Sequence, residues 1–289
     1  MSKGTVNDES LSRALRYAIA RRRGEEASRR LREAELLRAE NARLERGLLP
    51  SPLIFNSELS WATRYKPGGQ RALLGGDFFD AVELSDGTIR VVIGDVCGHG
   101  PNEAALGVAL RVAWRALALA DQTPEKTLLA LERVLQVERN DAAMFVTFAT
   151  LCDIELGTDL KRAQIRLAGH PAPLLFDGTT VIEAPVTERN LPLGATRCLG
   201  ECSPNVIDLD PGWTMLAFTD GLVEARVGND GARLDTVGLE RLAQSAFETA
   251  GTLGGVADKL IADAEDCNGA PLADDVALVL LSTAPRWRH

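Results

Sequence analysis

The stretch Gly75–Gly100 reads GGDFFDAVELSDGTIRVVIGDVCGHG, and the rest of the chain is organised around it. It predicts two acidic loops joined by one strand. The first loop carries Asp77 and Asp80, after which an Asp-Gly turn signal and the β-branched segment 89–93 lead to Asp95. Glycines beside an aspartate at a strand end let backbone and carboxylate approach one point closely, and carboxylate oxygens are the ligands that hard divalent cations prefer.

Further aspartates stand at the ends of two other apolar strands. Asp220 follows a strand in FTDGLVE, and Asp274 and Asp275 precede the last strand in ADDVALVLL. A single aspartate of this kind most often caps a turn, whereas several packed together unpaired would repel and raise each other's pKa. Two divalent cations would remove this repulsion, lower the pKa of a bridging water and bind a phosphoryl oxygen. The sequence has no Ser-His-Asp spacing, no phosphate-binding GxxxxGK and no HExxH to support a rival mechanism.

The composition indicates a globular body preceded by a basic arm. The 289 residues are 45% hydrophobic and carry a net charge of −9, so we do not expect nucleic acid as a partner. Residues 1–50 contain 12 Lys and Arg against 8 Asp and Glu, and the remainder contains 20 against 33. This asymmetry favours two units with different tasks.

The same composition bounds the compartment. The amino terminus is polar and charged, so we expect no signal peptide, and no apolar run reaches the roughly 18 residues of a membrane span. An odd number of cysteines without zinc spacing favours reduced thiols in a cytoplasmic protein. The five cysteines are Cys97, Cys152, Cys198, Cys202 and Cys267.

The arm is expected to be helical and to be a candidate dimerisation segment. Residues 1–10 are expected to be disordered, residues 11–49 have a helical composition, and Gly24 should break or bend this segment into two helices. A heptad pattern places Ala27, Ala34, Asn41 and Leu48 at a, and Leu37 and Leu44 at d. A polar a residue such as Asn41 can fix the register of a parallel dimer. A helix packed on its own domain and a solvated linker are equally good interpretations, and a helix on an anionic surface through residues 21–23 is a third.

The body is expected to span residues 50–283, with a loose tail over 284–289. Tight turns join nine or ten predicted strands, which favours antiparallel sheets, and four predicted helices occur in two pairs. The sequence therefore predicts an α+β sandwich with one helix layer on each side. The expected helices run over about 101–120, 123–140, 236–249 and 252–266. The expected strands run over about 59–65, 89–93, 144–154, 159–168, 172–176, 180–182, 205–209, 213–218 and 276–281.

Six motifs in order resemble the bacterial stage II sporulation protein E family: GGDFFD, GDVCGHG, AGHPAPLLF, LPLG, FTDGLVEAR and DDVALVLL. That family belongs to the metal-dependent serine/threonine phosphatases of the protein phosphatase 2C fold, and the resemblance covers about residues 47–283. It implies two antiparallel sheets flanked by helix pairs, with two Mn²⁺ or Mg²⁺ ions at the edge of the sandwich. It also implies that a metal-activated water attacks the phosphorus of a phosphoserine or phosphothreonine directly.

The resemblance also assigns roles to individual residues. Asp95 is expected to bridge both ions, with the Val96 carbonyl on one of them. Asp220 and Asp274 are expected to hold one ion, and Asp77 to help hold the other. Two further acids are expected to lie behind these ligands or to serve as alternates to Asp77 and Asp274, namely Asp80 and Asp275.

The chain departs from the wider fold in several places. Cys97 stands where the wider fold has a histidine that is proposed to act as general acid. A cysteine there could make the activity sensitive to oxidation, but we interpret Cys97 as a small buried residue. His99 could serve catalysis or simply pack its loop, and we expect His170 to hold a turn. No arginine clearly corresponds to the phosphate-binding arginine of the eukaryotic enzymes.

The usual substrates of the family are phosphorylated anti-anti-sigma proteins, in the partner-switching control of stress or development. The resemblance therefore implies a protein substrate of this class, and residues 11–49 could act as the regulatory input by forming a homodimer. Two alternatives remain open at this stage. The body could be a degenerate phosphatase fold that serves as a binding platform, or a hydrolase of small phosphoesters.

Overall fold

The computed structural model describes residues 16–17, 19, 21–26, 28–29, 32, 49–69, 75–98, 100–139, 147–195, 202–228 and 231–287. The chain divides into two compact units, Met1–Gly47 and Leu48–His289. Several predictions lie outside the described residues: the disorder of residues 1–10, the heptad positions from 27 to 48, His99 and Cys198.

In the N-terminal unit, the described residues are helical and exposed. Ion pairs one turn apart join Arg21 to Glu25 at 2.8 Å and Arg22 to Glu26 at 3.3 Å. Of the expected break or bend at Gly24, the break is wrong, because residues 21–26 form continuous helix. A glycine costs a helix only about 1 kcal/mol relative to alanine, so flanking helix formers and such pairs can carry the helix through it.

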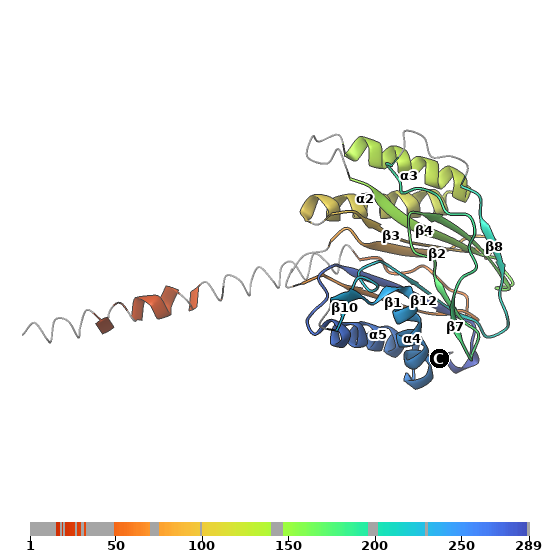
Figure 1. The fold of residues 1–289 in the computed structure, drawn as a ribbon. Helices are drawn as coiled ribbons and strands as arrows, with labels where there is room; N and C mark the ends of the chain where they lie inside the picture. The colour runs from red at the N-terminus through yellow and green to blue at the C-terminus, as the bar shows by residue number, and fades with distance from the viewer. Residues whose placement is uncertain are drawn as a thin grey trace, which may run out of the picture. The chain divides into compact units, whose positions relative to one another are not determined.

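The body contains two antiparallel sheets of five strands each, with their faces packed together (Figure 1). The first sheet has the order β2 (Phe78–Glu83), β3 (Ile89–Val96), β4 (Ala149–Leu156), β5 (Arg162–Ala168), β8 (Asn205–Asp208). The second has the order β1 (Ser60–Lys66), β12 (Val276–Ser282), β9 (Thr214–Phe218), β6 (Leu174–Phe176), β7 (Val181–Glu183). A short hairpin stands apart from both, formed by β10 (Arg226–Val227) and β11 (Ala232–Arg233).

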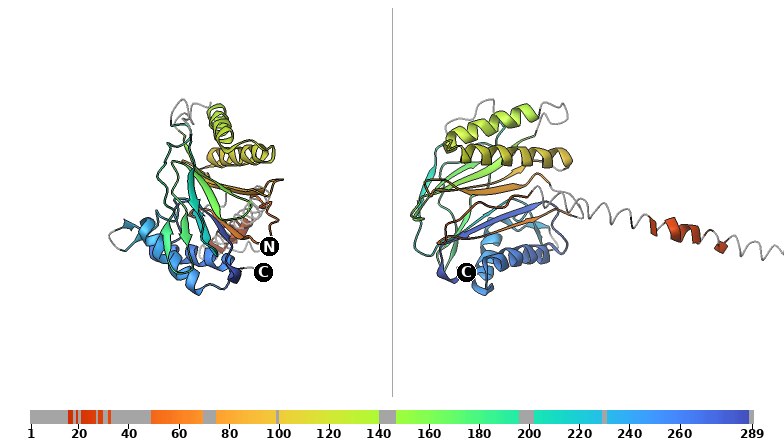
Figure 2. Two further views of the ribbon diagram at one scale, coloured as in Figure 1. Left: turned by 90° about the vertical axis from the view of Figure 1, so that its right-hand side faces the viewer. Right: turned by 180° about the vertical axis from the view of Figure 1, so that it is seen from behind.

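A pair of helices covers the outer face of each sheet, as the views in Figure 2 show. The first sheet carries α2 (Pro101–Leu119) and α3 (Pro124–Glu138), and the second carries α4 (Asp235–Thr249) and α5 (Leu253–Asn268). Two of these helices begin at threonine caps: Thr123 Oγ1 accepts from Lys126 N at 3.4 Å, and Thr252 Oγ1 accepts from Gly255 N at 3.0 Å. The predicted sandwich with helix pairs on both sides is confirmed.

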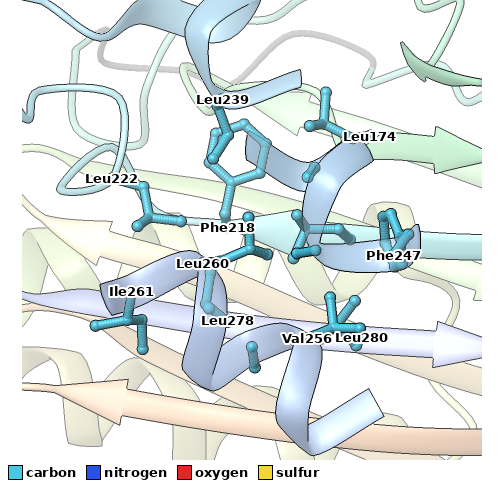
Figure 3. Packing of buried hydrophobic residues seen from close by; sticks show 14 of the residues in the cluster. Leu174, Phe218, Leu222, Leu239, Phe247, Val256, Leu260, Ile261, Leu278 and Leu280 are labelled. Atoms are coloured by element: carbon cyan, nitrogen blue, oxygen red, sulfur yellow. The ribbon is translucent and has the colours of Figure 1, made fainter. Parts of the chain in front are cut away.

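The last strand, β12, is apolar on both faces because both faces are buried. Val276, Leu278 and Leu280 pack under α4 and α5, whereas Ala277 and Val279 face the core between the sheets. A strand buried on both sides has no solvent face, so it shows no alternation of apolar and polar residues. Figure 3 shows the helix-side cluster, in which Leu278 and Leu280 lie among the side chains of both helices.

The structure differs from the sequence-based expectation in three segments. Asp80 was expected in a loop but lies inside strand β2. The hairpin of β10 and β11 was not predicted, since strands of two residues carry no periodic signal. The tail was expected to be loose, but Pro285–Trp287 is a 3₁₀ turn whose tryptophan is buried in the helix-side core, where the Trp287 carbonyl accepts a hydrogen bond from Ser60 Oγ at 3.0 Å.

Candidate metal centre

The acidic residues meet because four strand ends lie at one end of the sandwich. Antiparallel pairing of β2 with β3 sets Phe78 opposite Gly94, so Asp77 and Asp95 flank the same edge of the first sheet. In the second sheet, β9 ends at Phe218 opposite Leu278 of β12. The end of β9 and the beginning of β12 therefore lie together, which brings residues 219–220 beside residues 274–275.

A threonine hydroxyl joins the two sheets at this edge. Thr219 Oγ1 donates to Asp77 Oδ2 at 2.7 Å and accepts from Ala277 N at 2.8 Å. Thr219 is fully buried, and Asp77 is nearly so. The hydroxyl thus fixes the orientation of the Asp77 carboxylate from the opposite sheet. Thr219 was not among the predicted site residues, and its only signal in the sequence is its position directly before Asp220.

The carboxylates are held in an environment that opposes their negative charge. Burial, followed by the charge of Asp95, raises the pKa of Asp77 well above its usual value. Burial and then Asp220 raise the pKa of Asp95 to about 7. The pKa of Asp220 rises to about 6 through burial and then through Glu224 and Asp274. The charged groups that shift the pKa of Asp77 and Asp95 are all carboxylates, so the cluster has an excess of negative charge.

Two glycines allow the backbone to approach this cluster. A Cβ atom on Gly76 would lie 2.3 Å from the Val96 carbonyl oxygen and 2.9 Å from Asp95 Oδ1. A Cβ atom on Gly221 would lie 2.0 Å from the Asp275 carbonyl oxygen. Contacts this short are impossible, so only glycine fits at either position. The Val96 carbonyl, which the resemblance assigned to an ion, therefore stands beside the Asp95 carboxylate.

The donor set fits a hard divalent cation in its chemistry. Carboxylates and one main-chain carbonyl are the oxygen ligands that Mg²⁺ and Mn²⁺ take, and a cation would relieve the repulsion that raises these pKa values. Their atoms are not yet arranged as a finished coordination shell. Within the described part of the chain, no group of three His, Cys, Asp or Glu side chains is disposed to hold a metal ion. Binding would require the carboxylates to turn toward a common point.

Asp80 and Asp275, which were expected to lie behind the ligands or to replace two of them, lie in different surroundings. Asp80 is not an alternate to Asp77, because its side chain points to helix α2, where Arg111 Nη1 donates to it at 3.1 Å and Arg115 Nε at 2.7 Å. Asp275 does belong to the cluster: it accepts from Gly68 N at 2.8 Å and its charge raises the pKa of both Asp77 and Asp95. Asp274 is exposed, and its Oδ1 accepts from Asp275 N at 2.9 Å.

The remaining candidates are a thiol and a histidine. Cys97 is exposed, so its interpretation as a buried residue is wrong; its partial desolvation and then Asp95 raise the pKa of its thiol. His170 is buried, its Nδ1 lies 2.9 Å from the Pro171 carbonyl oxygen, and burial lowers its pKa to about 4. A neutral imidazole that donates to the adjacent carbonyl holds the turn at Gly169, which has φ +68°.

Comparison with solved structures identifies the fold. The chain is similar to the RsbU and RsbW domains of Rv1364c from Mycobacterium tuberculosis, with 29% identity and a TM-score of 0.63 over 78% of this chain and 59% of that one. It is also similar to the SiaA-PP2C domain of Pseudomonas aeruginosa, with 18% identity and a TM-score of 0.68 over 88% and 97% of the two chains. A third similar structure is the PP2C phosphatase domain with a fragment of the regulatory domain of SpoIIE from Bacillus subtilis. Its identity is 16% and its TM-score 0.63, over 78% of this chain and 63% of that one.

The chain thus spans less than two thirds of the first and third of these relatives. At the lower identities the likeness concerns the fold alone, which is that of protein phosphatase 2C domains. The model of the family "Stage II sporulation protein E (SpoIIE)" matches residues 85–284, which is more than two thirds of the sequence. This match includes four of the acidic residues described above, Asp95, Asp220, Asp274 and Asp275. The chain therefore belongs to the stage II sporulation protein E family, a family of protein phosphatase 2C-type hydrolases.

Proposed function

We propose that this chain is a metal-dependent protein phosphatase that hydrolyses phosphoserine or phosphothreonine. The observation that carries the proposal is the cluster of Asp77, Asp95, Asp220 and Asp275 at one end of the sandwich. Buried carboxylates whose pKa values are raised by each other mark a site that is built for positive charge. Membership of the family supports hydrolysis of a phosphoester there.

The resemblance to the family supports the following roles for the individual acids. Asp95, with the Val96 carbonyl, would contact both ions; Asp220 and Asp274 would hold one, and Asp77 the other. When bound, two Mn²⁺ or Mg²⁺ ions supply an activated water and neutralise charge on the phosphoryl oxygens. The protein supplies the orientation: Thr219 holds Asp77, and the bond from Gly68 N holds Asp275.

The proposed substrate is a phosphorylated anti-anti-sigma factor in a partner-switching pathway. The motif resemblance and the likeness to the RsbU domain support this choice. A phosphoprotein should then be a far better substrate than a nucleotide or another small phosphoester. Equal rates on a phosphoserine peptide and on a nucleotide would instead favour a small-molecule phosphatase.

We further propose that residues 11–49 form a homodimer and act as the regulatory input, and that the protein works in the cytoplasm. Among the residues that the structure describes, none of the helices combines the length and apolar character needed to cross a membrane. Light scattering and phosphatase assays on the full chain and on Leu48–His289 test the role of the arm, since that unit is compact by itself. Equal subunit number and equal activity in both would exclude it.

A further inference from the structure

A pocket adjoins the acidic cluster on the side of the unpredicted hairpin. It has a volume of about 260 Å³ and is lined on one side by Gly98, Gly221 and Asp274, which belong to the acidic loops. Its other side is formed by Arg226 and Arg233 of the hairpin and by the end of helix α5. In Figure 1, β10 lies beside α5. A substrate chain leaving the cluster in this direction would pass the two arginines.

Each arginine is held at the pocket wall by a hydrogen bond from its Nη1 atom, and the other N–H groups of the guanidinium can face a ligand. Arg233 Nη1 donates to Glu224 Oε1 at 2.7 Å, with 68% of its side chain exposed. Arg233 lines the same pocket as Asp274 and Gly221, so it lies near the cluster. Arg226 is exposed, and its Nη1 donates to the Gly231 carbonyl at 3.3 Å. A guanidinium has five N–H donors in a planar fork that matches a carboxylate.

We propose that this pocket, which we call the arginine pocket, receives the residues next to the phosphorylated side chain, and that Arg226 and Arg233 select acidic residues there. The inference rests on the proposed phosphatase function. It names the substrate class more closely: phosphopeptides with aspartate or glutamate beside the phosphoserine. Arginine and carboxylate form charge-assisted, frequently bidentate hydrogen bonds, which are the stronger kind.

The charges around the pocket determine how strongly it can select an acidic peptide. The body of the chain is acidic, so an acidic peptide is repelled by most of it and attracted only locally. The pocket also contains two acids, Glu224 and Asp274. Asp274 belongs to the proposed metal centre, and Glu224 is bound to Arg233 and would compete with a substrate carboxylate for it. Removing the charge of Glu224 should therefore strengthen the preference for acidic peptides.

The test compares two phosphoserine peptides in the full chain with Mn²⁺. One peptide has aspartates on both sides of the phosphoserine, and the other has alanines there. The readout is the ratio of kcat/KM for the acidic peptide to that for the neutral one, and we expect it to be about 10 in the wild type. Arg233→Ala and Arg226→Ala should each lower the ratio by roughly threefold or more through KM, and Glu224→Gln should raise it.

The matched control is Arg162→Ala. Arg162 is an exposed arginine on strand β5 of the first sheet, with 64% of its side chain accessible. It pairs with Asp208 on the neighbouring strand β8 at 3.1 Å. Arg162→Ala removes the same charge from a similar surface pair but leaves the arginine pocket unchanged, so the ratio of kcat/KM values should stay at the wild-type value. Arg233→Glu is a second probe, because reversing the charge should bring the ratio below that of Arg233→Ala. Circular dichroism melting checks that each variant is folded.

The outcomes separate this inference from the proposed function. A wild type that hydrolyses both peptides at equal kcat/KM overturns the arginine pocket and leaves the phosphatase intact. A loss in Arg233→Ala that is equal for the two peptides also overturns it, since the arginine would then act on the phosphate that both share. A wild type that releases phosphate from neither peptide, nor from p-nitrophenyl phosphate, contradicts the proposed function itself.

Discussion

Thr219 and Asp77, 142 residues apart in the chain, are joined by a 2.7 Å hydrogen bond from Oγ1 to Oδ2. The bond crosses from one sheet to the other, and Ala277 N donates to the same hydroxyl at 2.8 Å. One buried hydroxyl thus ties the edge of the second sheet to a carboxylate of the first. The relationship makes the alignment of the two sheets a condition for the geometry of the acidic cluster.

Thr219→Val is expected to weaken Mn²⁺ binding about tenfold, because outer partners that orient a ligand typically change metal affinity by about 10–100-fold. The valine keeps the shape of the side chain but cannot donate to Asp77, whose pKa should rise further. Calorimetric titration of the metal-free protein with Mn²⁺ measures the affinity. Thr219→Ser is the control and should retain near wild-type affinity, because it keeps the hydroxyl. Identical affinities for the valine and serine variants would contradict the role given to this bond.

The metal-free protein is expected to lose stability as the pH rises from about 4 to about 7. The folded-state pKa of Asp95 is about 7 and that of Asp220 about 6, both above the value of about 3.9 for an unfolded aspartate. The folded state therefore binds more protons than the unfolded state in this interval, and the free energy of unfolding falls with rising pH. Asp95→Asn removes one such charge and should stabilise the metal-free protein at pH 8 by at least about 1 kcal/mol.

The difference between wild type and Asp95→Asn isolates this effect. His170 works in the opposite direction, since its buried imidazole has a pKa of about 4 and favours the folded state at higher pH. Urea denaturation in a chelator, at pH 5 and pH 8, gives the free energy of unfolding for both proteins. The asparagine variant should gain on the wild type as the pH rises. A gain that is equal at both pH values would show that Asp95 carries no raised pKa.

Asp80→Asn is expected to destabilise the fold by about 3 kcal/mol while leaving Mn²⁺ affinity within about twofold of the wild type. The Asp80 side chain is fully buried, and the variant leaves the largely buried Arg111 and Arg115 without their carboxylate. Urea denaturation and calorimetry measure the two quantities on the same samples. Loss of metal binding in a stably folded Asp80→Asn would mean that Asp80 belongs to the metal centre after all.

Leu260→Ala is expected to cost about 2–5 kcal/mol of unfolding free energy, because it opens a cavity in the core under α4 and α5. Leu129→Ala is the comparison on an exposed site, since the Leu129 side chain is 43% accessible on α3. It should cost less than about 1 kcal/mol. Thermal melting of both variants checks the prediction, and equal losses would mean that the helix-side core is not packed as described.

Much of the fold could be predicted from local signals. The helices that open with Thr123 and Thr252, and the apolar run of β12, appear close to where the sequence places them. The sandwich itself followed from the turn-rich connections and the paired helices. Two-residue strands and the burial of Trp287 could not be predicted in this way, because they depend on contacts with segments distant in the chain.

The positions of the candidate site residues in the chain could be predicted, but not how these residues meet. The sequence placed Asp95 and Asp220 at strand ends, but their meeting depends on the register of two separate sheets, which only the family resemblance implied. Asp80 was expected in a loop and lies in a strand, because its spacing of three residues from Asp77 is compatible with either. In the strand, its side chain turns to the α2 face and pairs with Arg111 and Arg115. Thr219 lies in the motif FTDGLVEAR, but nothing in that motif indicates a bond to Asp77, which is 142 residues away in the chain.

The most direct test of the central claim is release of phosphate from p-nitrophenyl phosphate by the full chain with Mn²⁺, with a chelator, and in Asp95→Asn with Mn²⁺. We expect turnover that requires Mn²⁺ and falls at least about 100-fold in Asp95→Asn, together with loss of Mn²⁺ binding in calorimetry. Turnover that survives the chelator or the asparagine substitution would contradict it. So would a wild type that binds no Mn²⁺ in calorimetry, because the acidic cluster would then be no metal centre.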